Sequence, residues 1–380
     1  MMMTEILAEL VSVPSLPGTP NDRITDVICG RLDAPGVTLH RLATPEGRWN
    51  LLASIGPADL PGLMLSGHSD VVSTEGQEWD SDPFCLTEVE DRLVARGTSD
   101  MKGFLAAMLD LVPDLLQMPL KRPVHLAFSC DEEIGCRGVP HLIARLPELI
   151  ARPAGCVVGE PSDLHPVRAH KGKQSVEIRL EGRPGHSSDP AQGVNAIYPA
   201  ARLALEVENI AAAFAAMGPF DQDFTPPNST LQAGVIQGGV AVNIIPEHAR
   251  MLIEARTIPA QSPADVIARV SAALDHIGAS AKAAGRPFRS TIEVLASYPA
   301  LSPRGNEELA GLLSQITGQP IIQAVSYGTE AGLFAQAGIP SVVCGPGNIS
   351  RAHRANEFIH PQELSACADM LRKIVSRNCL

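Results

Sequence analysis

The stretch LMLSGHSDVV, residues 63–72, places a histidine and an aspartate directly after a run of apolar residues. The run is typical of a buried strand, so His68 and Asp70 are expected where that strand ends. Residues i and i+2 of an extended strand point to the same side, which would put the imidazole of His68 beside the carboxylate of Asp70. Such a pair is either a satisfied core histidine or a metal ligand with the acid that orients it.

Similar apolar runs elsewhere in the chain predict an α/β fold. The predicted strands alternate with helical patterns, which indicates a mostly parallel central sheet. We expect strands at 50–55, 62–67, 123–130, 155–159, 290–295, 320–325 and 340–346, and helices at 4–11, 21–32, 101–117, 137–150, 306–317, 330–338 and 361–376.

A different pattern begins near residue 171. Residues 171–180 alternate apolar and polar side chains, which is typical of a strand with one solvated face. An alanine-rich helix (193–217), two strands (229–239 and 248–258) and a helix that begins after Ser262 and ends near 284 follow. We therefore predict a catalytic domain made of residues 1–170 and 288–380, interrupted by a small α+β domain at 171–287.

Composition limits the class of partner and the location. The chain has 380 residues and a formal net charge of −12, which argues against nucleic acid or an anionic membrane surface as the main partner. Its eight cysteines form no Cys-x-x-Cys pair, which favours free thiols in a reducing compartment. Because the N-terminus lacks a basic region and no apolar run approaches about 18 residues, a cytoplasmic protein is expected.

More potential metal ligands follow the other predicted strands. Carboxyl ends of parallel strands form the ligand-binding edge of such a sheet. Taken singly, each residue has an ordinary alternative: a structural histidine, a solvated Glu-Glu pair, a helix N-cap for Asp100 or a simple strand end for Glu160. The candidates at this edge are His68, Asp100, Glu132, Glu133, Glu160 and His353.

Nitrogen and oxygen ligands without a thiolate suit zinc, and also cobalt or manganese. Two histidines and three carboxylates would make five protein ligands. That number exceeds the three that one catalytic zinc usually keeps, so two metal ions with a bridging carboxylate fit better. Of the adjacent pair, Glu133 can bind metal while Glu132 serves as general base toward a metal-bound water. Asp70 would accept the far N–H of His68 and fix its tautomer.

The motifs GHSDVV, ARGTSDMKGF, DEEIG, GEPSD and GPGNISRAH, in this order, resemble those of the co-catalytic zinc amidohydrolase and peptidase family. That family includes acetylornithine deacetylase, succinyl-diaminopimelate desuccinylase, aminoacylase and carboxypeptidase G. The sequence is most similar to the acetylornithine deacetylase branch over GEPSDLHPVRAHKGKQSVEIRLEGRPGHSSDPAQGVNAI. The resemblance implies a phosphorylase/hydrolase-like catalytic domain with an inserted ferredoxin-like lid or dimerisation domain.

The resemblance also implies roles for the candidate ligands. His68 and Glu160 would hold one zinc, and Glu133 and His353 the other. Asp100 would bridge the two ions. Both ions are expected to be Zn²⁺, with Co²⁺ as the alternative. The peptide bond after Asp100 is expected to be cis, as it is in relatives.

Four further residues receive roles from the same resemblance. His186 would stabilise the oxyanion of the tetrahedral intermediate, often in the active site of the other subunit of a dimer. The alternative is a plain surface histidine. Asn243 and Arg256 would hold the substrate carboxylate, although Arg256 could be an ordinary surface residue. Glu330 could meet the ammonium of the substrate or be a buried structural acid.

The implied reaction is hydrolysis of N2-acetyl-L-ornithine to acetate and L-ornithine, a step of arginine biosynthesis, by a homodimer formed through the lid. Another N-acyl amino acid or a dipeptide is the nearest alternative substrate. A metal-binding protein without catalysis is the alternative from another class. A serine hydrolase is disfavoured because no Gly-x-Ser-x-Gly elbow occurs.

Overall fold

The computed structural model describes residues 3–57 and 59–380. The chain forms two compact units. The first unit contains the residues up to Ala169 together with Leu301–Ala324 and Thr329–Leu380. The second contains His170–Ala300 and Val325–Gly328.

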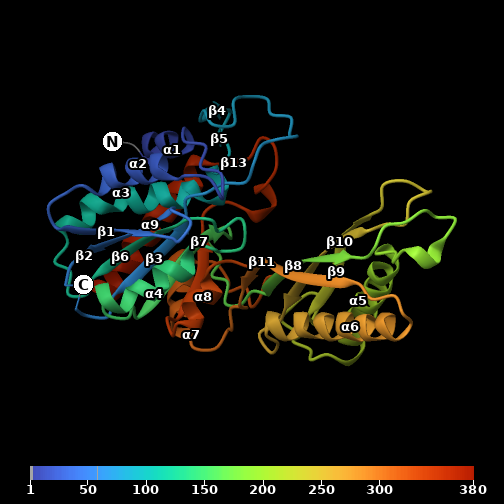
Figure 1. The fold of residues 1–380 in the computed structure, drawn as a ribbon. Helices are drawn as coiled ribbons and strands as arrows, with labels where there is room; N and C mark the ends of the chain where they lie inside the picture. Colours follow the sequence, from blue (N-terminus) through green and yellow to red (C-terminus); the bar gives the residue numbers. More distant parts are fainter. Residues whose placement is uncertain (1–2, 58) are drawn as a thin grey trace. The chain divides into compact units, whose positions relative to one another are not determined.

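The first unit is built on a six-stranded sheet, seen in blue to red at the centre of that unit in Figure 1. Its strands, in spatial order, are β1 (Val37–Ala43), β2 (Trp49–Ile55), β6 (Val124–Ser129), β3 (Leu63–His68), β7 (Gly155–Pro161) and β12 (Ser341–Gly345). The last four strands of this order run parallel, whereas β1 and β2 are antiparallel to their neighbours. The predicted α/β class with a mostly parallel sheet is confirmed.

Helices cover both faces of this sheet. Helices α1, α2 and α3 lie on one face and α4 on the other (Figure 1). Helix α3 is buried along nearly its whole length because it packs between the sheet and the helices α1 and α9. The bounds are α1 (Met3–Val11), α2 (Asp22–Leu32), α3 (Gly103–Gln117), α4 (Val139–Leu149), α7 (Glu307–Thr317), α8 (Ala331–Gln336) and α9 (Pro361–Cys379).

A second, small sheet of the same unit joins distant parts of the sequence. It consists of β4 (Thr87–Val89), β5 (Arg92–Val94) and β13 (Phe358–Ile359), in the order β13-β5-β4. The pairing of β13 with β5 brings residues near 357 next to residues near 95. The segment Thr98–Lys102 follows and leads into α3, and its backbone is not helical at Asp100 and Met101.

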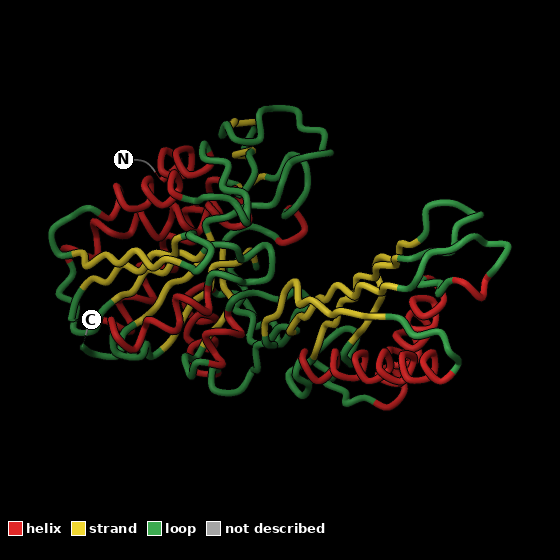
Figure 2. Tube along the Cα trace, in the orientation of Figure 1, coloured by secondary structure: helices red, strands yellow, loops and turns green. Residues whose placement is uncertain are grey.

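The second unit is a four-stranded antiparallel sheet with two helices on one face (Figure 2). Its elements are β8 (Gly172–Glu181), α5 (Ile197–Met217), β9 (Thr230–Gly238), β10 (His248–Thr257), α6 (Pro263–Ala283) and β11 (Arg289–Tyr298). The spatial order is β11-β8-β10-β9. This βαββαβ arrangement is the ferredoxin-like one.

Two local predictions need correction. The sequence predicts that residues 290–295 belong to the catalytic domain, which would resume at residue 288. In the structure these residues lie in β11, which pairs with β8, and the second unit extends to Ala300. Residues 320–325 form only isolated bridges to Val167 and His170 instead of a strand. In both cases a short apolar pattern indicates an extended segment and carries no information about its partner.

Among the described residues, no helix is both long enough and apolar enough to cross a membrane.

One buried histidine of the sheet makes stability depend on pH. His125 lies in β6 with no exposed surface. Its Nδ1 is 2.8 Å from the hydroxyl of Ser54, and its Nε2 has no partner within the part of the chain that the structure describes. Burial lowers the pKa of His125 to about 4.

Between about pH 6.5 and 4 the unfolded chain therefore binds a proton that the folded chain excludes, so stability falls as pH falls. From about pH 7 to pH 5 the histidine should lower the free energy of unfolding by about 2 kcal/mol. His125→Asn should remove that part of the decrease, as measured by denaturant unfolding of the metal-free protein at both pH values. The exposed His276 supplies the control, because His276→Asn should keep the wild-type pH dependence. A His125→Asn profile identical to wild type would contradict the prediction.

Candidate metal centre

The central parallel strands deliver acidic and imidazole side chains to one edge of the first unit. His68 is the last residue of β3, which lies between β6 and β7. Glu132 and Glu133 follow the end of β6, and Glu160 lies near the end of β7. Parallel strands share their carboxyl edge, so residues separated by up to about ninety positions meet there.

Asp100 lies between two imidazoles and turns a different carboxylate oxygen toward each. Its Oδ1 is 3.0 Å from Nε2 of His68, and its Oδ2 is 3.3 Å from Nε2 of His353. The carboxylate itself is buried. A bridging ligand needs this divergent arrangement.

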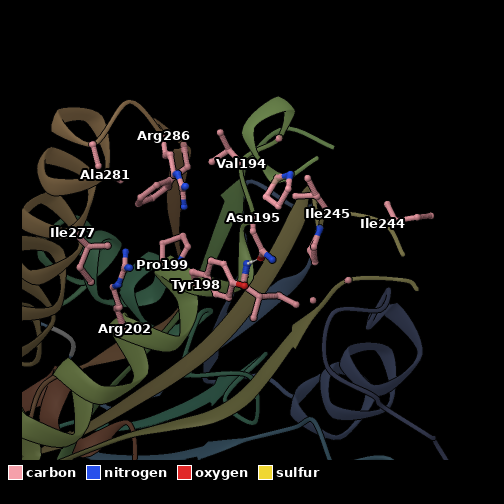
Figure 3. A pocket seen from close by; sticks show the side chains of 18 of the residues that line it. Val194, Asn195, Tyr198, Pro199, Arg202, Ile244, Ile245, Ile277, Ala281 and Arg286 are labelled. Carbon is pink, nitrogen blue, oxygen red and sulfur yellow. Dashed lines mark hydrogen bonds between the residues drawn. The ribbon is translucent and has the colours of Figure 1, made fainter. Parts of the chain in front are cut away.

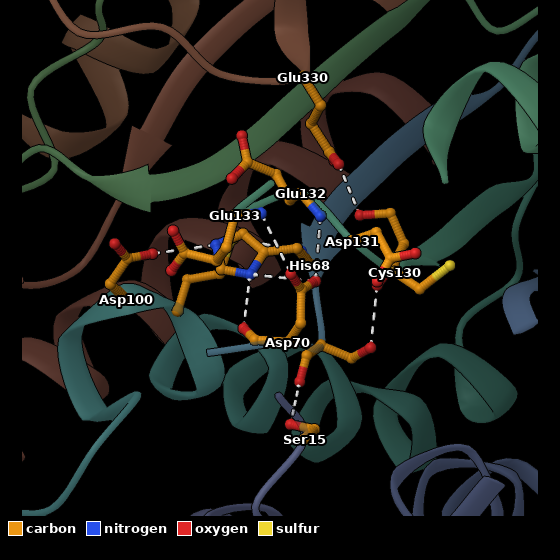
Figure 4. Close-up of polar contacts among 12 residues, drawn as sticks. Ser15, His68, Asp70, Asp100, Cys130, Asp131, Glu132, Glu133 and Glu330 are labelled. Carbon is orange, nitrogen blue, oxygen red and sulfur yellow. Dashed lines mark hydrogen bonds and ion pairs between the residues drawn. The ribbon is translucent and has the colours of Figure 1, made fainter. Parts of the chain in front are cut away.

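The remaining predicted ligands complete two groups around Asp100. Glu160 Oε1 is 3.6 Å from Nε2 of His68, and Glu133 Oε2 is 3.0 Å from Nε2 of His353. Potential ligand atoms of His68, Asp100 and Glu133 lie within 4.8 Å of one another. The structure thus brings all five predicted ligands together, and several of them are labelled in Figure 4.

The predicted contact between the side chains of His68 and Asp70 is wrong in its detail. Nδ1 of His68 is 2.8 Å from the backbone carbonyl oxygen of Asp70 and 3.8 Å from its carboxylate. The carboxylate instead accepts the backbone N–H groups of Glu132 and Glu133, at 3.2 and 3.1 Å (Figure 4). Strand β3 ends at His68, so the alternation of an extended strand does not continue to Asp70. Asp70 still orients His68, through its carbonyl, and also fixes the loop with the two glutamates.

Glu132, the predicted general base, is largely buried. Its Oε1 accepts a hydrogen bond from the thiol of Cys136 at 3.1 Å. Glu132 can also share a ligand group with His68 and Glu160, because their potential ligand atoms lie within 4.8 Å of one another. Its carboxylate therefore lies beside the proposed ligands.

The pKa values of the buried carboxylates indicate whether a cation fits the cluster. Burial raises the pKa of Glu132 to about 8, and the negative charge of Glu133 adds to this effect. Burial and the carboxylate of Asp100 likewise raise the pKa of Glu160 well above its ordinary value. These buried carboxylates repel one another, and a divalent cation among their oxygens would offset that repulsion. The donor set of imidazoles and carboxylates therefore fits a divalent cation.

Backbone geometry agrees with one further expectation. The peptide bond Asp100–Met101 is cis, so the predicted isomer is confirmed.

Glu330 is completely buried at the start of α8. The hydroxyl of Ser66 donates to its Oε1 at 2.5 Å, and the hydroxyl of Ser129 donates to its Oε2 at 2.6 Å. This geometry matches the buried structural acid, which is the alternative to a substrate contact. Glu330 thus ties the ends of β3 and β6 to α8.

The other three predicted substrate or catalytic residues belong to the second unit. His186 and Asn243 lie on adjacent segments, since the N–H of Ser187 donates to the carbonyl oxygen of Asn243 at 3.1 Å. Arg256 lies on β10, where its Nε donates to Oε1 of Glu254 at 2.8 Å. Their roles toward substrate stay predictions.

Sequence reasoning missed four residues that contact the centre or join the residues that do. Cys136 touches Glu132, while Gln77, Arg96 and Glu357 form a network described below. A signal existed for two of them, since Arg96 lies in the motif ARGTSDMKGF and Glu357 lies four residues after His353. Charged residues in such positions read as surface residues unless their burial is known.

Comparison with known proteins agrees with this geometry. Residues 64–377 match the peptidase family M20/M25/M40. The chain is 34% identical over 379 residues to an acetylornithine deacetylase of Myxococcus xanthus, covering 98% of this chain and 96% of the relative. It is 32% identical to the acetylornithine deacetylase of Photorhabdus laumondii, covering 99% and 97%.

Among solved structures, an M20 family metallo-carboxypeptidase from Sulfolobus solfataricus is similar with a TM-score of 0.78 at 20% identity, covering 99% of this chain and 98% of that chain. The aminopeptidase PepT of Bacillus cereus has a TM-score of 0.73 at 21% identity, covering 98% and 97%. At these identities the likeness shows the fold. The family match and the full-length relatives go further, and together they establish that the chain belongs to peptidase family M20/M25/M40 and is a hydrolase of that family.

Proposed function

We propose that the chain is a dinuclear metal-dependent amidohydrolase that cleaves N-acylated amino acids, with N2-acetyl-L-ornithine as the leading substrate. The observation that carries this proposal is the position of Asp100, whose two oxygens face His68 and His353 separately. In this proposal His68 and Glu160 hold one cation, Glu133 and His353 hold the other, and Asp100 is shared. Zn²⁺ or Co²⁺ suits these ligands.

When bound, the cations would supply Lewis acidity toward water and the acyl carbonyl. The chain itself would supply the proton transfer. Glu132 would accept a proton from the water that attacks the carbonyl carbon, and would then deliver it to the nitrogen as the C–N bond breaks. Acetate and ornithine leave, and the Glu132 carboxylate is regenerated.

Asp70 would support this chemistry by holding the proposed ligands and base in place. Its carbonyl accepts the Nδ1–H of His68, which leaves Nε2 free to face a cation. Its carboxylate holds the backbone of Glu132 and Glu133, the proposed base and its ligand neighbour. One residue therefore contacts the imidazole of His68 and the backbone of both glutamates.

The substrate assignment is supported by relatives named acetylornithine deacetylase, which are 31–34% identical over nearly the whole chain. The test is a hydrolysis screen on zinc-loaded and cobalt-loaded enzyme. N2-acetyl-L-ornithine is expected to show the highest kcat/KM among acetylornithine, acetylmethionine, succinyl-diaminopimelate and dipeptides. A higher value for another compound would replace the substrate and keep the reaction class. No hydrolysis by the loaded protein would favour a binding protein without catalysis.

We also propose a homodimer formed through the second unit. Strand β9 is an edge of its sheet, and the adjoining residues expose apolar side chains, among them Val240 at 87% and Val242 at 101% of their full area. Both valines line a hollow of about 1210 Å³, together with α5, α6 and other residues of 238–246 (Figure 3). Unpaired edge strands with apolar side chains are surfaces that another strand can cover.

A dimer should be visible by light scattering coupled to size-exclusion chromatography. Replacing both Val240 and Val242 by lysine should shift the protein toward monomer, because charged side chains at a sheet edge oppose pairing with another chain. Val294, an exposed valine on the opposite edge strand β11, provides the control, and Val294→Lys should leave the dimer intact. A wild-type monomer at micromolar concentration would refute the proposal.

Cytoplasmic location is proposed from the thiols. All eight cysteines are free, and six of them are buried. Free thiols are typical of a reducing compartment. Detection of the native protein in an oxidising compartment would contradict this assignment.

A further inference from the structure

Three residues outside the ligand set connect the backbones of two ligands. Gln77, Arg96 and Glu357 form a continuous chain of hydrogen bonds, here called the Gln77–Arg96–Glu357 network. One end of the network reaches the backbone of Asp100 and the other reaches the backbone of His353. All of these residues belong to the first unit.

At one end, the carboxylate of Glu357 holds the backbone that carries Asp100. Its Oε1 accepts the N–H of Ser99 at 2.8 Å and the N–H of Asp100 at 2.9 Å. Two donors on one charged oxygen restrict the direction of this segment more than a single bond would. Because Asp100 must face two imidazoles at once, a small rotation of its backbone would move it away from one of them.

At the other end, Gln77 holds the backbone of His353. Nε2 of Gln77 donates to the carbonyl oxygen of His353 at 2.9 Å. His353 has a φ of 61°, a left-handed conformation that costs a non-glycine residue about 1 kcal/mol and needs surrounding contacts to persist. The bond from Gln77 is such a contact, and it acts on the ligand residue itself.

The orientation of the Gln77 amide is well determined by its neighbours. Its Oε1 accepts from Nη2 of Arg96 at 2.5 Å and from the indole Nε1 of Trp79 at 3.2 Å. Two donors identify this atom as the oxygen. The remaining atom, facing the carbonyl of His353, is therefore the NH₂ group.

Arg96 joins the two ends. Its Nη1 donates to Oε2 of Glu357 at 2.7 Å, and both side chains are only 1% exposed. The planar guanidinium fixes the separation of its two partners, which a flexible ammonium would not do. The guanidinium also lies over the ring of Trp79, 5.1 Å from its centre.

We propose that the Gln77–Arg96–Glu357 network positions Asp100 and His353 relative to one another and thereby shapes the cation site that they would share with Glu133. This inference rests on the proposed function, since it requires that cations bind. It assigns to these three residues a positioning role, with no contact to substrate. Their loss should weaken one of the two cation sites more than the other.

The decisive variant is Gln77→Glu. A glutamate keeps the acceptor that Arg96 needs, but it has no N–H for the carbonyl of His353. The half-buried position tolerates the nearly isosteric change, so folding should be retained. The added negative charge would by itself attract cations, so a loss of affinity would arise from geometry and not from charge.

Calorimetric titration of metal-free protein with Zn²⁺ should resolve the two sites. Gln77→Glu should bind one equivalent about 10-fold more weakly than wild type, in the range typical of residues that orient ligands, while the other equivalent changes less. The visible absorption of bound Co²⁺ should also change, and the denaturant midpoint of the metal-free protein should not. Gln362→Glu, the same substitution at an exposed position of the first unit, should match wild type in all three measurements.

Gln77→Leu has no donor and adds no charge, and it should also bind one equivalent of cation more weakly than wild type. It replaces Gln77→Glu as the test if that variant does not fold. Wild-type affinity and an unchanged Co²⁺ spectrum in the folded variants would overturn the positioning role alone. A wild-type protein that binds no cation would overturn the proposed function, and the positioning role with it.

Discussion

Glu132→Gln should lower kcat for the best N-acyl amino acid by about 10³-fold, the middle of the range for removal of a general base. Glutamine has almost the same shape and can still accept from the thiol of Cys136, which lies 3.1 Å from Oε1 of Glu132. It cannot take the proton from the attacking water. KM should change little, because the proposed base does not bind the substrate carboxylate.

The control for this variant is the metal content. Elemental analysis should find the same two equivalents of cation in Glu132→Gln as in wild type, since Glu132 is not one of the proposed ligands. Glu88→Gln, an exposed position of the same unit, should keep full activity. Wild-type kcat in a metal-loaded Glu132→Gln protein would eliminate the proposed proton transfer.

Asp100→Asn should abolish activity by removing the shared ligand. The amide has one oxygen and one NH₂ group, so it cannot present an oxygen both to the cation beside His68 and to the cation beside His353. We expect the bound cation to fall from two equivalents to one or fewer, measured by elemental analysis after dialysis. The loss of one negative charge would lower the affinity of the remaining ligands for a cation further.

The matched control is Asp59→Asn, an exposed aspartate of the first unit, which should retain both equivalents. Two tightly bound cations in Asp100→Asn, with activity near that of wild type, would show that Asp100 is not shared. The two predictions are independent, because the first removes a proton acceptor and the second removes a ligand.

The location of the site could be predicted because strand ends are visible in the sequence. Apolar runs ending before His68, Glu132 and Glu160 indicate strands, and parallel strands converge at their carboxyl ends. The sequence could not predict that His68 contacts the carbonyl of Asp70 instead of its carboxylate. This contact depends on β3 ending one residue after Gly67, and strand ends are uncertain by a few residues. The same uncertainty affected the start of α5, expected at 193 and observed at Ile197.

The partner of each strand was harder to predict than the strand itself. Residues 290–295 alternate as a strand should, but nothing in that alternation distinguishes the sheet of the first unit from that of the second. Strand β1 was missed because only one of its seven residues is buried, so its apolar pattern is weak. Strands β4, β5 and β13, of two or three residues, are too short to produce a pattern.

The pairing of Arg96 with Glu357 is a contact that a local sequence pattern cannot reveal. The two residues are separated by 261 positions, and either one alone resembles a surface charge. Only the pairing of β5 with β13 brings them together. Their burial is thus a property of the tertiary fold.

The distribution of the ligands along the chain has a consequence for biosynthesis. A nascent polypeptide that has grown past Glu160 already carries four of the five proposed ligands, yet the whole second unit must be translated before His353 and Glu357 emerge from the ribosome. Edge strand β12 of the large sheet arrives in the same late segment. If the chain binds the proposed pair of cations, its complete loading would therefore follow synthesis of nearly the entire chain.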